Sequence, residues 1–178
     1  ENEKMIEYNK LDKDDKFIER QIHIYDENGN KIEVTKYNSY GSIEGKTNFK
    51  YDNLNNMIEK ESFNSDGSLK KKNLFKYDNL NNMIEMDYFN SDGYLDIKKT
   101  YKYDKNGNAI EIISYNSEGG INDECTYKYD KNGNVVEIIE RRFFSSILKE
   151  ITSEYDENGN IVEKCNSVDG SSLTTYTY

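Results

Sequence analysis

Acidic and amide side chains recur in this chain in the pattern Asp-x-Asn-Gly-Asn-x-x-Glu, which first runs from residue 26 to residue 33. Carboxylate and amide oxygens around a glycine turn are the kind of ligands that Ca²⁺ takes. The spacing does not fit an EF-hand loop, which has glycine at its sixth position and glutamate at its twelfth. We therefore favour ordinary turn chemistry, and we expect neither a metal nor a cofactor. The weaker calcium alternative would use, with their equivalents in later copies, Asp26, Asn28, Asn30 and Glu33.

A glutamate closes every copy of this pattern, and paired carboxylates at a fixed separation are what glycoside hydrolysis requires. On neighbouring hairpins of a sheet such glutamates would be about 9.6 Å apart, and a lysine such as Lys50 or Lys102 would lie between most of them. A solvated, ion-paired stripe is the favoured interpretation, so we expect no enzyme activity and no catalytic residue. The glutamates are Glu33, Glu59, Glu85, Glu111, Glu137 and Glu163.

The chain has one histidine and two cysteines. His23 stands where later copies have Phe49 or Tyr101, so we interpret it as a substitute for an aromatic residue rather than as a general base. Cys125 and Cys165 would be about 14 Å apart in a simple series of strands, beyond the ~7 Å between Cα atoms that a disulfide allows. We expect two free thiols.

All of these residues are positioned by a repeat of 26 residues that is marked by the dipeptide Tyr-Asp. Numbering each repeat from its tyrosine, position 6 is asparagine, position 8 is isoleucine or valine, and position 9 is glutamate. We interpret residues 1–178 as a single array whose ends fall inside a unit, which favours a piece of a longer array. The tyrosines at position 1 are Tyr25, Tyr51, Tyr77, Tyr103, Tyr129 and Tyr155. The predicted units are a partial one at 1–24, full ones at 25–50, 51–76, 77–102, 103–128 and 129–154, and a shortened last one at 155–178.

Each unit has two turn signals separated by segments too short for helices and rich in Ile, Val, Tyr, Phe and Thr. This spacing is typical of antiparallel hairpins. The sequence therefore predicts an all-β fold, a repetitive antiparallel β-hairpin meander of about 14 strands. Only 34% of the residues are hydrophobic, so we expect a thin architecture without a thick core. A long sheet of this kind should curl or spiral with its aromatic face inside.

Two repeats have Leu-Asn where the others have Asn-Gly in the first turn, as at Leu54 and Leu80. Leucine resists the positive φ that both central residues of a type I′ turn need. We therefore predict a type I turn followed by one left-handed residue, at position 5, or at position 6 if the loop has four residues. The aspartate at position 2 should accept backbone N–H groups of the turn.

A loop over positions 3 to 6 also predicts the register across the first turn. The expected pairs in the second unit are Tyr51 with Ile58, Lys50 with Glu59, and Phe49 with Lys60. Positions 1, 8, 19 and 25 would then line one aromatic and aliphatic face. Position 13 conflicts with this arrangement, so we expect a bulge between positions 10 and 13, or a register that is off by one residue.

The 24 basic and 34 acidic residues give a net charge of −10, which would repel a phosphate backbone. We expect no nucleic-acid partner, and no apolar run is long enough for a membrane span. Tyrosine and asparagine can stack on and hydrogen-bond to sugars or peptides, which suggests an unidentified protein or carbohydrate ligand. Most of the 16 tyrosines follow the repeat and should serve packing. Tyr40 and Tyr94 stand outside that register and are the candidate ligand contacts. Self-association through sheet edges or the aromatic face is a further possibility.

The units that begin at Tyr103 and Tyr155, YDKNGNAIE and YDENGNIVE, resemble the YD repeats of Rhs-type proteins. The likeness covers nearly the whole chain, although the 26-residue period is longer than the unit usual in that family. The resemblance implies a bacterial surface or secreted protein. In that family long arrays spiral into a hollow β shell that can enclose a toxic C-terminal domain, and shorter arrays have been linked to carbohydrate binding.

We therefore expect a non-enzymatic repeat scaffold or ligand-binding module of an extracellular or cell-surface protein. One alternative is a cytoplasmic immunity protein that binds and neutralises a toxin, for which a small acidic chain is suitable. A second alternative is a fragment of a toxin-encapsulating shell. An export signal upstream of this segment would exclude the immunity interpretation.

Overall fold

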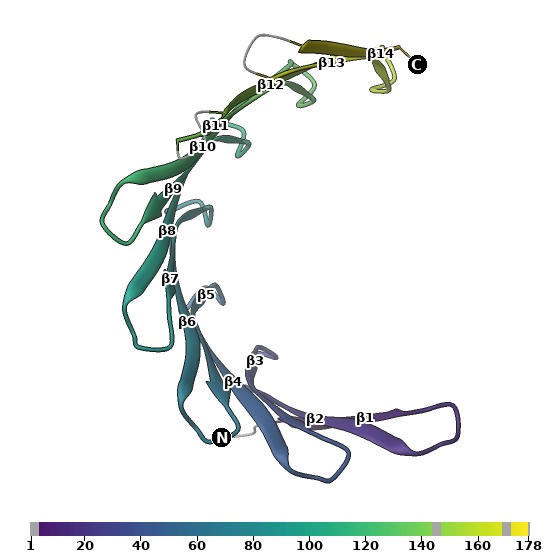
Figure 1. Ribbon diagram of the computed structural model, residues 1–178, viewed down its shortest axis with the longest axis vertical. Coiled ribbons are helices and arrows are strands. Elements are labelled where there is room, and N and C mark those ends of the chain that lie inside the picture. The colour runs from purple at the N-terminus through teal and green to yellow at the C-terminus, as the bar shows by residue number, and fades with distance from the viewer. Residues whose placement is uncertain (1–3, 144–146, 169–171, 178) are drawn as a thin grey trace. The chain divides into compact units, whose positions relative to one another are not determined.

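The computed structural model describes residues 4–143, 147–168 and 172–177, and all of its regular elements are β-strands (Figure 1). Within the described residues, the first and second turns of a repeat each join two consecutive strands. The strands are β1 (Lys4–Leu11), β2 (Phe17–Tyr25), β3 (Lys31–Tyr37), β4 (Ile43–Tyr51), β5 (Met57–Asn64), β6 (Leu69–Tyr77), β7 (Met83–Phe89), β8 (Leu95–Tyr103), β9 (Ala109–Asn116), β10 (Ile121–Tyr129), β11 (Val135–Arg142), β12 (Ile147–Tyr155), β13 (Ile161–Val168) and β14 (Ser172–Thr177).

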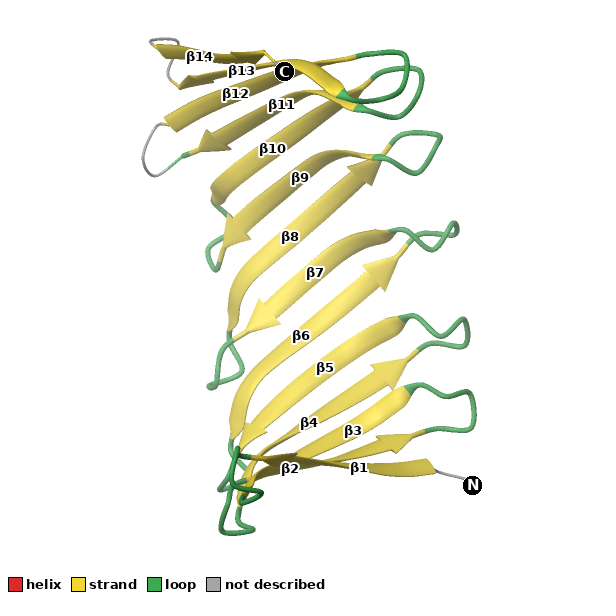
Figure 2. Ribbon diagram, turned by 90° about the vertical axis from the view of Figure 1, so that its right-hand side faces the viewer, coloured by secondary structure: helices red, strands yellow, loops and turns green. Residues whose placement is uncertain are grey.

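The strands follow one another in chain order, β1 to β14, and each pairing that the register defines is antiparallel (Figure 2). No helix occurs in the described residues, and hence none there that could cross a membrane. These observations confirm the predicted all-β hairpin meander. The reason is local, because β-branched and aromatic residues alternate with polar ones between turns placed about a dozen residues apart.

The chain divides into two compact units. The first contains residues 1–77 and 86–96, and therefore strands β1 to β6; the second contains residues 78–85 and 97–178, and therefore β9 to β14. Strands β7 and β8 contribute residues to both units. The curling of the sheet as a whole stays a prediction.

No hydrophobic side chain is fully buried among the described residues, which agrees with the predicted thin architecture. A sheet of one layer leaves both faces open to water, so apolar side chains are covered only by their neighbours on the same face. Cross-strand pairs are then the main source of stability, each contributing about 0.2–1 kcal/mol. The buried side chains are small polar ones in the middle of strands, namely Thr35, Ser62, Asn73 and Ser114.

The register across the first turn is predicted correctly for two of three pairs. Lys50 lies opposite Glu59, and Phe49 lies opposite Lys60. Tyr51, however, lies opposite Met57 rather than Ile58. The prediction of a pair between positions 1 and 8 is therefore wrong. The physical reason is a β-bulge, in which position 8 is the extra residue next to position 7.

A second bulge follows the second turn. Phe63 lies opposite Leu69 and Ser62 lies opposite Lys71, which leaves Lys70, at position 20, as the extra residue. The same shift occurs between β1 and β2, β3 and β4, and β9 and β10. It is absent between β11 and β12, where the sequence lacks the asparagine and glycine of the second turn. The bulge predicted between positions 10 and 13 is thus wrong, because the extra residues stand at positions 8 and 20.

Alternation along the strands then defines two faces. The tyrosine face carries positions 1, 10, 12, 21, 23 and 25, and the glutamate face carries positions 9, 11, 13, 19, 22, 24 and 26. Placing position 19 on the same face as positions 1 and 25 was therefore wrong. The bulge at position 20 reverses its direction and puts it beside position 13, which removes the conflict at that position.

Candidate functional site

The Tyr-Asp turn is the feature that the chain repeats most strictly, and its aspartate organises it. In the second repeat the carboxylate of Asp52 accepts the backbone N–H groups of Leu54 and Asn56, each at 2.9 Å. The side-chain Nδ2 of Asn56 donates to the other carboxylate oxygen at 3.1 Å. The same three contacts occur in all six Tyr-Asp turns. The structural role predicted for this aspartate is confirmed.

The conformation of this turn is the predicted one, with the left-handed residue at position 5. Asn55 N–H donates to the carbonyl oxygen of Asp52 at 3.1 Å, and Asp52 N–H donates to that of Asn56 at 2.9 Å. These two bonds enclose a loop of three residues rather than four. Asn55 and Asn81 both have φ of 64°, and Gly107 has 85° at the equivalent place. Position 5 is glycine in four of the Tyr-Asp turns and asparagine in the other two, because these residues tolerate this conformation best.

The turn stabilises the ionised form of its aspartate. Hydrogen bonds from the side chain and then the backbone of Asn134 hold the pKa of the half-buried Asp130 below its usual value. The pKa values of Asp78 and Asp156 are lowered in the same way by Asn82 and Asn160. N–H donors aimed at a carboxylate favour its charged form. Each turn therefore presents a fixed negative charge.

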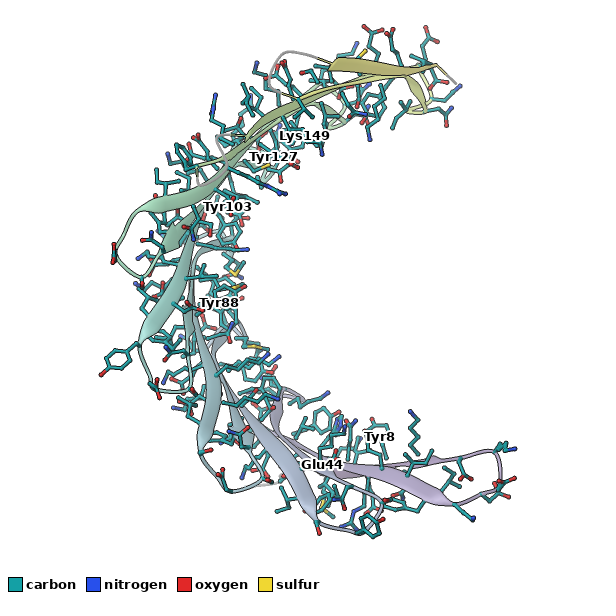
Figure 3. All side chains as sticks on the ribbon, viewed as in Figure 1. Tyr8, Glu44, Tyr88, Tyr103, Tyr127 and Lys149 are labelled. Atoms are coloured by element: carbon teal, nitrogen blue, oxygen red, sulfur yellow. The ribbon has the colours of Figure 1, made fainter. Side chains whose placement is uncertain are left out.

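In five of the six Tyr-Asp pairs the tyrosine bonds to the preceding repeat, whereas the hydroxyl of Tyr25 lies 3.5 Å from His23 Nδ1. Tyr103, which is labelled in Figure 3, donates its hydroxyl to the backbone carbonyl of Met83 at 2.8 Å. That carbonyl belongs to position 7, directly before the bulge residue, where the regular ladder is interrupted. The five contacts of this kind are Tyr51 to Lys31, Tyr77 to Met57, Tyr103 to Met83, Tyr129 to Ala109, and Tyr155 to Val135, at 2.7–3.0 Å.

Sequence reasoning missed this contact. The acceptor is a backbone carbonyl, and any residue supplies one, so position 7 carries lysine, methionine, alanine, valine or isoleucine. The available signal was the contrast between an unvarying tyrosine and a variable partner position. Burial, followed by the charge of Asp52 in the preceding turn, raises the pKa of Tyr77. The hydroxyl is therefore a donor over the physiological pH range.

The second turns at Asn38, Asn90 and Asn116 have the same design with asparagine in place of aspartate. Asn38 Oδ1 accepts the N–H groups of Tyr40 at 2.9 Å and Ser42 at 3.1 Å, and Gly41 has φ of 79°. Tyr40 is 90% exposed, and Tyr94 in the turn between β7 and β8 is 72% exposed. Their accessibility fits the sequence interpretation. They lie on different hairpins with the β5–β6 hairpin between them, and their role as ligand contacts stays a prediction.

Five of the six glutamates at position 9 take part in the predicted ion-paired stripe. Glu59 contacts Lys50 on the preceding strand at 2.5 Å and Lys72 on the following strand at 2.7 Å. Hydrogen bonds from Lys50 and then Lys72 lower the pKa of Glu59. The predicted pairs to position 26 also occur as Lys102 with Glu111, and Lys128 with Glu137, both at 2.7 Å.

A second set of lysines in this stripe was not predicted. Position 22 is lysine in three successive repeats, and each of these lysines contacts the glutamate at position 9 of its own repeat. The recurrence at position 22 was the signal that could have identified them. The pairs are Lys46 with Glu33, Lys72 with Glu59, and Lys98 with Glu85, at 2.6–2.7 Å.

The weak calcium constellation is only partly assembled. Asp26 and Asn30 lie together in the turn, where Asn30 donates both its backbone and side-chain N–H groups to the Asp26 carboxylate. Glu33 instead accepts from the Thr35 hydroxyl and pairs with Lys46. Across the described ranges, no three histidine, cysteine, aspartate or glutamate side chains gather as a metal site would require.

His23 and the two cysteines are the remaining candidates from the sequence. The His23 ring lies 4.7 Å from the Tyr8 ring and contacts Gln21 Oε1 at 3.0 Å. Burial, followed by Lys31, lowers the pKa of His23. Both cysteines are free thiols, as expected from their separation.

The thiol of Cys125 affects a neighbouring tyrosine on the same face. Its hydrogen bond with Tyr127, followed by burial, raises the pKa of the Tyr127 hydroxyl to about 12. Burial also raises the pKa of Cys125. Both groups are therefore protonated at neutral pH, and nothing in this arrangement activates the thiol as a nucleophile.

Comparison with known proteins gives a likeness of fold. No family model matches the sequence, and no curated protein matches it. Among solved structures, TcdB2-TccC3 without its hypervariable C-terminal region matches with a TM-score of 0.52 and 13% identity over 94% of this chain. A Photorhabdus luminescens Tc holotoxin pore matches with a TM-score of 0.27 and 12% identity, over 97% of this chain and 14% of its own.

This chain spans only 11% of the TcdB2-TccC3 chain that it matches. At 13% identity the match shows a common fold and nothing finer. The repetitive antiparallel sheet described above is thus a fold that also occurs inside a much larger protein.

Proposed function

We propose that this chain is a non-enzymatic repeat scaffold, a stretch of β wall that belongs to a larger protein. The observation that carries the proposal is the tyrosine contact to the preceding repeat, which recurs five times with nearly constant geometry. Each repeat is thereby bonded to its neighbour in the same way, and the wall can be extended by any number of units.

The cause of the lowered aspartate pKa values supports a scaffold. A catalytic site usually needs a concave, partly desolvated pocket with perturbed acid and base groups. Here the lowered aspartate pKa values belong to half-buried turn residues whose carboxylates accept hydrogen bonds from the turn itself. Local hydrogen bonds within the turn explain why these pKa values are lowered. The position-2 carboxylates therefore need no catalytic role to account for them.

The proposed family is that of the YD repeats, and the proposed location is the surface or exterior of a bacterium. The resemblance of the Tyr-Asp units supports the family, and the fold of TcdB2-TccC3 is compatible with it. A protein or carbohydrate ligand would be held on the faces or turn edges of the wall. Tyr40 and Tyr94 are the proposed contacts because both rings are well exposed.

Protease treatment of intact source cells tests the location. Antibodies against this array would follow the full-length protein before and after addition of a protease that cannot enter cells. We expect loss of the array signal while a cytoplasmic marker protein survives. Survival of the array in intact cells, with loss only after lysis, would contradict the proposal and favour the cytoplasmic immunity interpretation.

A second candidate function is favoured by the match to TcdB2-TccC3, namely a segment of a shell that encloses a toxic domain. Limited proteolysis of the full-length natural protein distinguishes it from an open scaffold. A shell predicts that a domain flanking the array resists cleavage until the array is unfolded by denaturant. An open scaffold predicts cleavage of that domain at the same rate with or without the array.

A further inference from the structure

We propose that a hollow on the tyrosine face of β2 to β6 binds a small ligand with at least two oxyanion groups, phosphate or carboxylate. The hollow lies within the first compact unit and has a volume of about 550 Å³. Small-molecule sites are commonly about 300–1,000 Å³, so its size suits a ligand of a few tens of atoms at most. The inference concerns this face alone and is independent of the proposed location of the protein.

A missing side chain opens the floor of the hollow. Gly45 occupies position 21, where the other repeats carry Glu19, Lys71, Ile97, Asp123 or Lys149. A Cβ atom on Gly45 would stand 2.8 Å from the Phe63 carbonyl oxygen, so the close approach of β4 to β5 requires glycine. Glycine occupies position 21 in this repeat alone.

Two hydroxyl groups stand beside the glycine. Thr47 Oγ1 and Ser62 Oγ are 3.2 Å apart on adjacent strands, and Ser62 is only 8% exposed. Both hydroxyls line the hollow, and because only one of their two hydrogens is used in the bond between them, the other can be donated to a ligand oxygen. Val34 and Phe49 supply apolar wall on either side.

Lysines that no carboxylate neutralises surround this floor. Lys60, Lys70 and Lys71 line the hollow, and no ion pair involves them within the described part of the chain. The ammonium group of Lys60 stands 5.6 Å from the centre of the Phe49 ring. Lys60 and Lys71 lie diagonally on β5 and β6, about 7–8 Å apart at their backbones, so two oxyanion groups could be engaged together.

The acidic groups next to the hollow are already paired. Glu44, labelled in Figure 3, lines it and contacts Lys36 at 3.1 Å, and Lys36 also contacts Glu19 at 3.0 Å. The lysine between these two carboxylates offsets part of their charge at the rim. The three other lysines thus set a positive local potential.

A cluster of this kind is unusual in a chain with a net charge of −10. The Debye length at physiological salt is about 8 Å, so distant aspartates on the turn edges are largely screened while contacts in the hollow are not. Ammonium and hydroxyl donors recognise oxyanions, whereas a neutral ligand would leave three lysines without use. The charge pattern therefore favours an anion over a neutral sugar.

Isothermal titration of the whole chain with inorganic pyrophosphate and, in a second arm, with citrate tests the proposal and distinguishes phosphate from carboxylate ligands. Backbone amide chemical shifts recorded in the same titrations locate the site. We expect saturable binding of at least one anion, with the largest shifts at Thr47, Ser62 and Lys71. The double variant Lys60→Gln with Lys71→Gln should weaken binding at least tenfold.

The double variant Lys105→Gln with Lys131→Gln is the matched control, because it removes the same charge from exposed first turns far along the chain. It should bind the anion within twofold of the parent chain. Equal weakening by both double variants would mean that net charge alone governs binding, and would overturn the proposal. So would the absence of saturation with either anion, or shifts that concentrate outside β2 to β6.

Discussion

Five of the six Tyr-Asp pairs connect two repeats because their two side chains bond in opposite directions. The aspartate bonds forward into its own turn, as Asp78 does with Leu80 and Asn82. The tyrosine bonds backward to a carbonyl twenty residues earlier, as Tyr77 does with Met57. Successive side chains of an extended chain point to opposite sides, so one dipeptide can bond both to its own turn and to the preceding repeat. This is a physical reason for finding the two residue types together in every unit.

Replacing Tyr77 by phenylalanine tests the backward bond. The ring and its packing are retained, while the 3.0 Å bond to the Met57 carbonyl is lost. A hydrogen bond of this kind contributes about 0.5–1.5 kcal/mol, so the free energy of unfolding in urea should fall by about 1 kcal/mol. Tyr94→Phe is the control, because its hydroxyl stands on a ring that is 72% exposed, and it should change stability by less than about 0.3 kcal/mol. Equal effects of the two variants would contradict the role given to the tyrosine.

Substitutions of Asp104 test the forward bonds. Asn116 performs the same task in a second turn, where its Oδ1 accepts the N–H groups of Glu118 and Gly120. Asp104→Asn should therefore cost less than about 0.5 kcal/mol, whereas Asp104→Ala removes every acceptor and should cost about 1–2 kcal/mol, as the loss of a helix cap does. Chemical denaturation measures both. An asparagine variant as unstable as the alanine variant would show that the charge, and not the acceptor geometry, matters.

At the scale of the hairpin, the turn and most of the register were predictable, and the bulges were not. Gly and Asn at position 5 indicated the left-handed residue, because few other residues adopt positive φ. Ile58 gave no such signal, since isoleucine suits a regular strand as well as a bulge. Lys70 at position 20 gave no signal of a bulge either. The face on which position 19 lies therefore could not be predicted. Bulges here follow from turn geometry and from contacts between repeats, which composition alone does not encode.

The candidate sites likewise divide into features that were predictable from the sequence and features that were not. Pairs such as Lys50 with Glu59 were predictable because both residues recur at constant positions across one turn. The hollow at Gly45 was not, because it depends on the approach of β4 to β5 and on residues from five strands. Periodic features can thus be inferred from the repeat, whereas a feature that occurs in one repeat requires the structure.

The left-handed position of the first turn makes a hairpin-scale prediction. Gly133 has φ of 89°, and a Cβ atom there would meet nothing within 4 Å, so only backbone strain opposes a side chain. Gly133→Ala should cost about 1–2 kcal/mol. Gly133→Asn should cost about half as much or less, because Asn55 and Asn81 occupy the same position with φ of 64°. Thermal or urea unfolding of the two variants provides the comparison, and a less stable asparagine variant would contradict it.

For the molecule as a whole, stability must come from repetition, because no apolar side chain is fully buried in the described residues. Small contributions of the same sign then add over the repeats. The six position-2 aspartates are the clearest case, since each has its pKa lowered within its turn. A single one of these carboxylates would have little effect, but six act together on one folding equilibrium.

Together, the six lowered aspartate pKa values predict how the free energy of unfolding depends on pH. A carboxyl whose pKa is lower in the folded chain than the ordinary 3.8 binds more protons when unfolded, so its contribution is present above about pH 5 and is lost as the pH falls through the folded value. We expect the urea midpoint to fall steeply below about pH 4. Other groups, including Glu59 and His23, also have lowered pKa values, so the parent chain must be compared with a variant in which all six aspartates are asparagine. The difference in midpoint between the two chains should be constant above about pH 5 and should shift against the parent at lower pH. A difference that stays constant down to pH 2.5 would show that the turn aspartates contribute through geometry alone and carry no pH dependence.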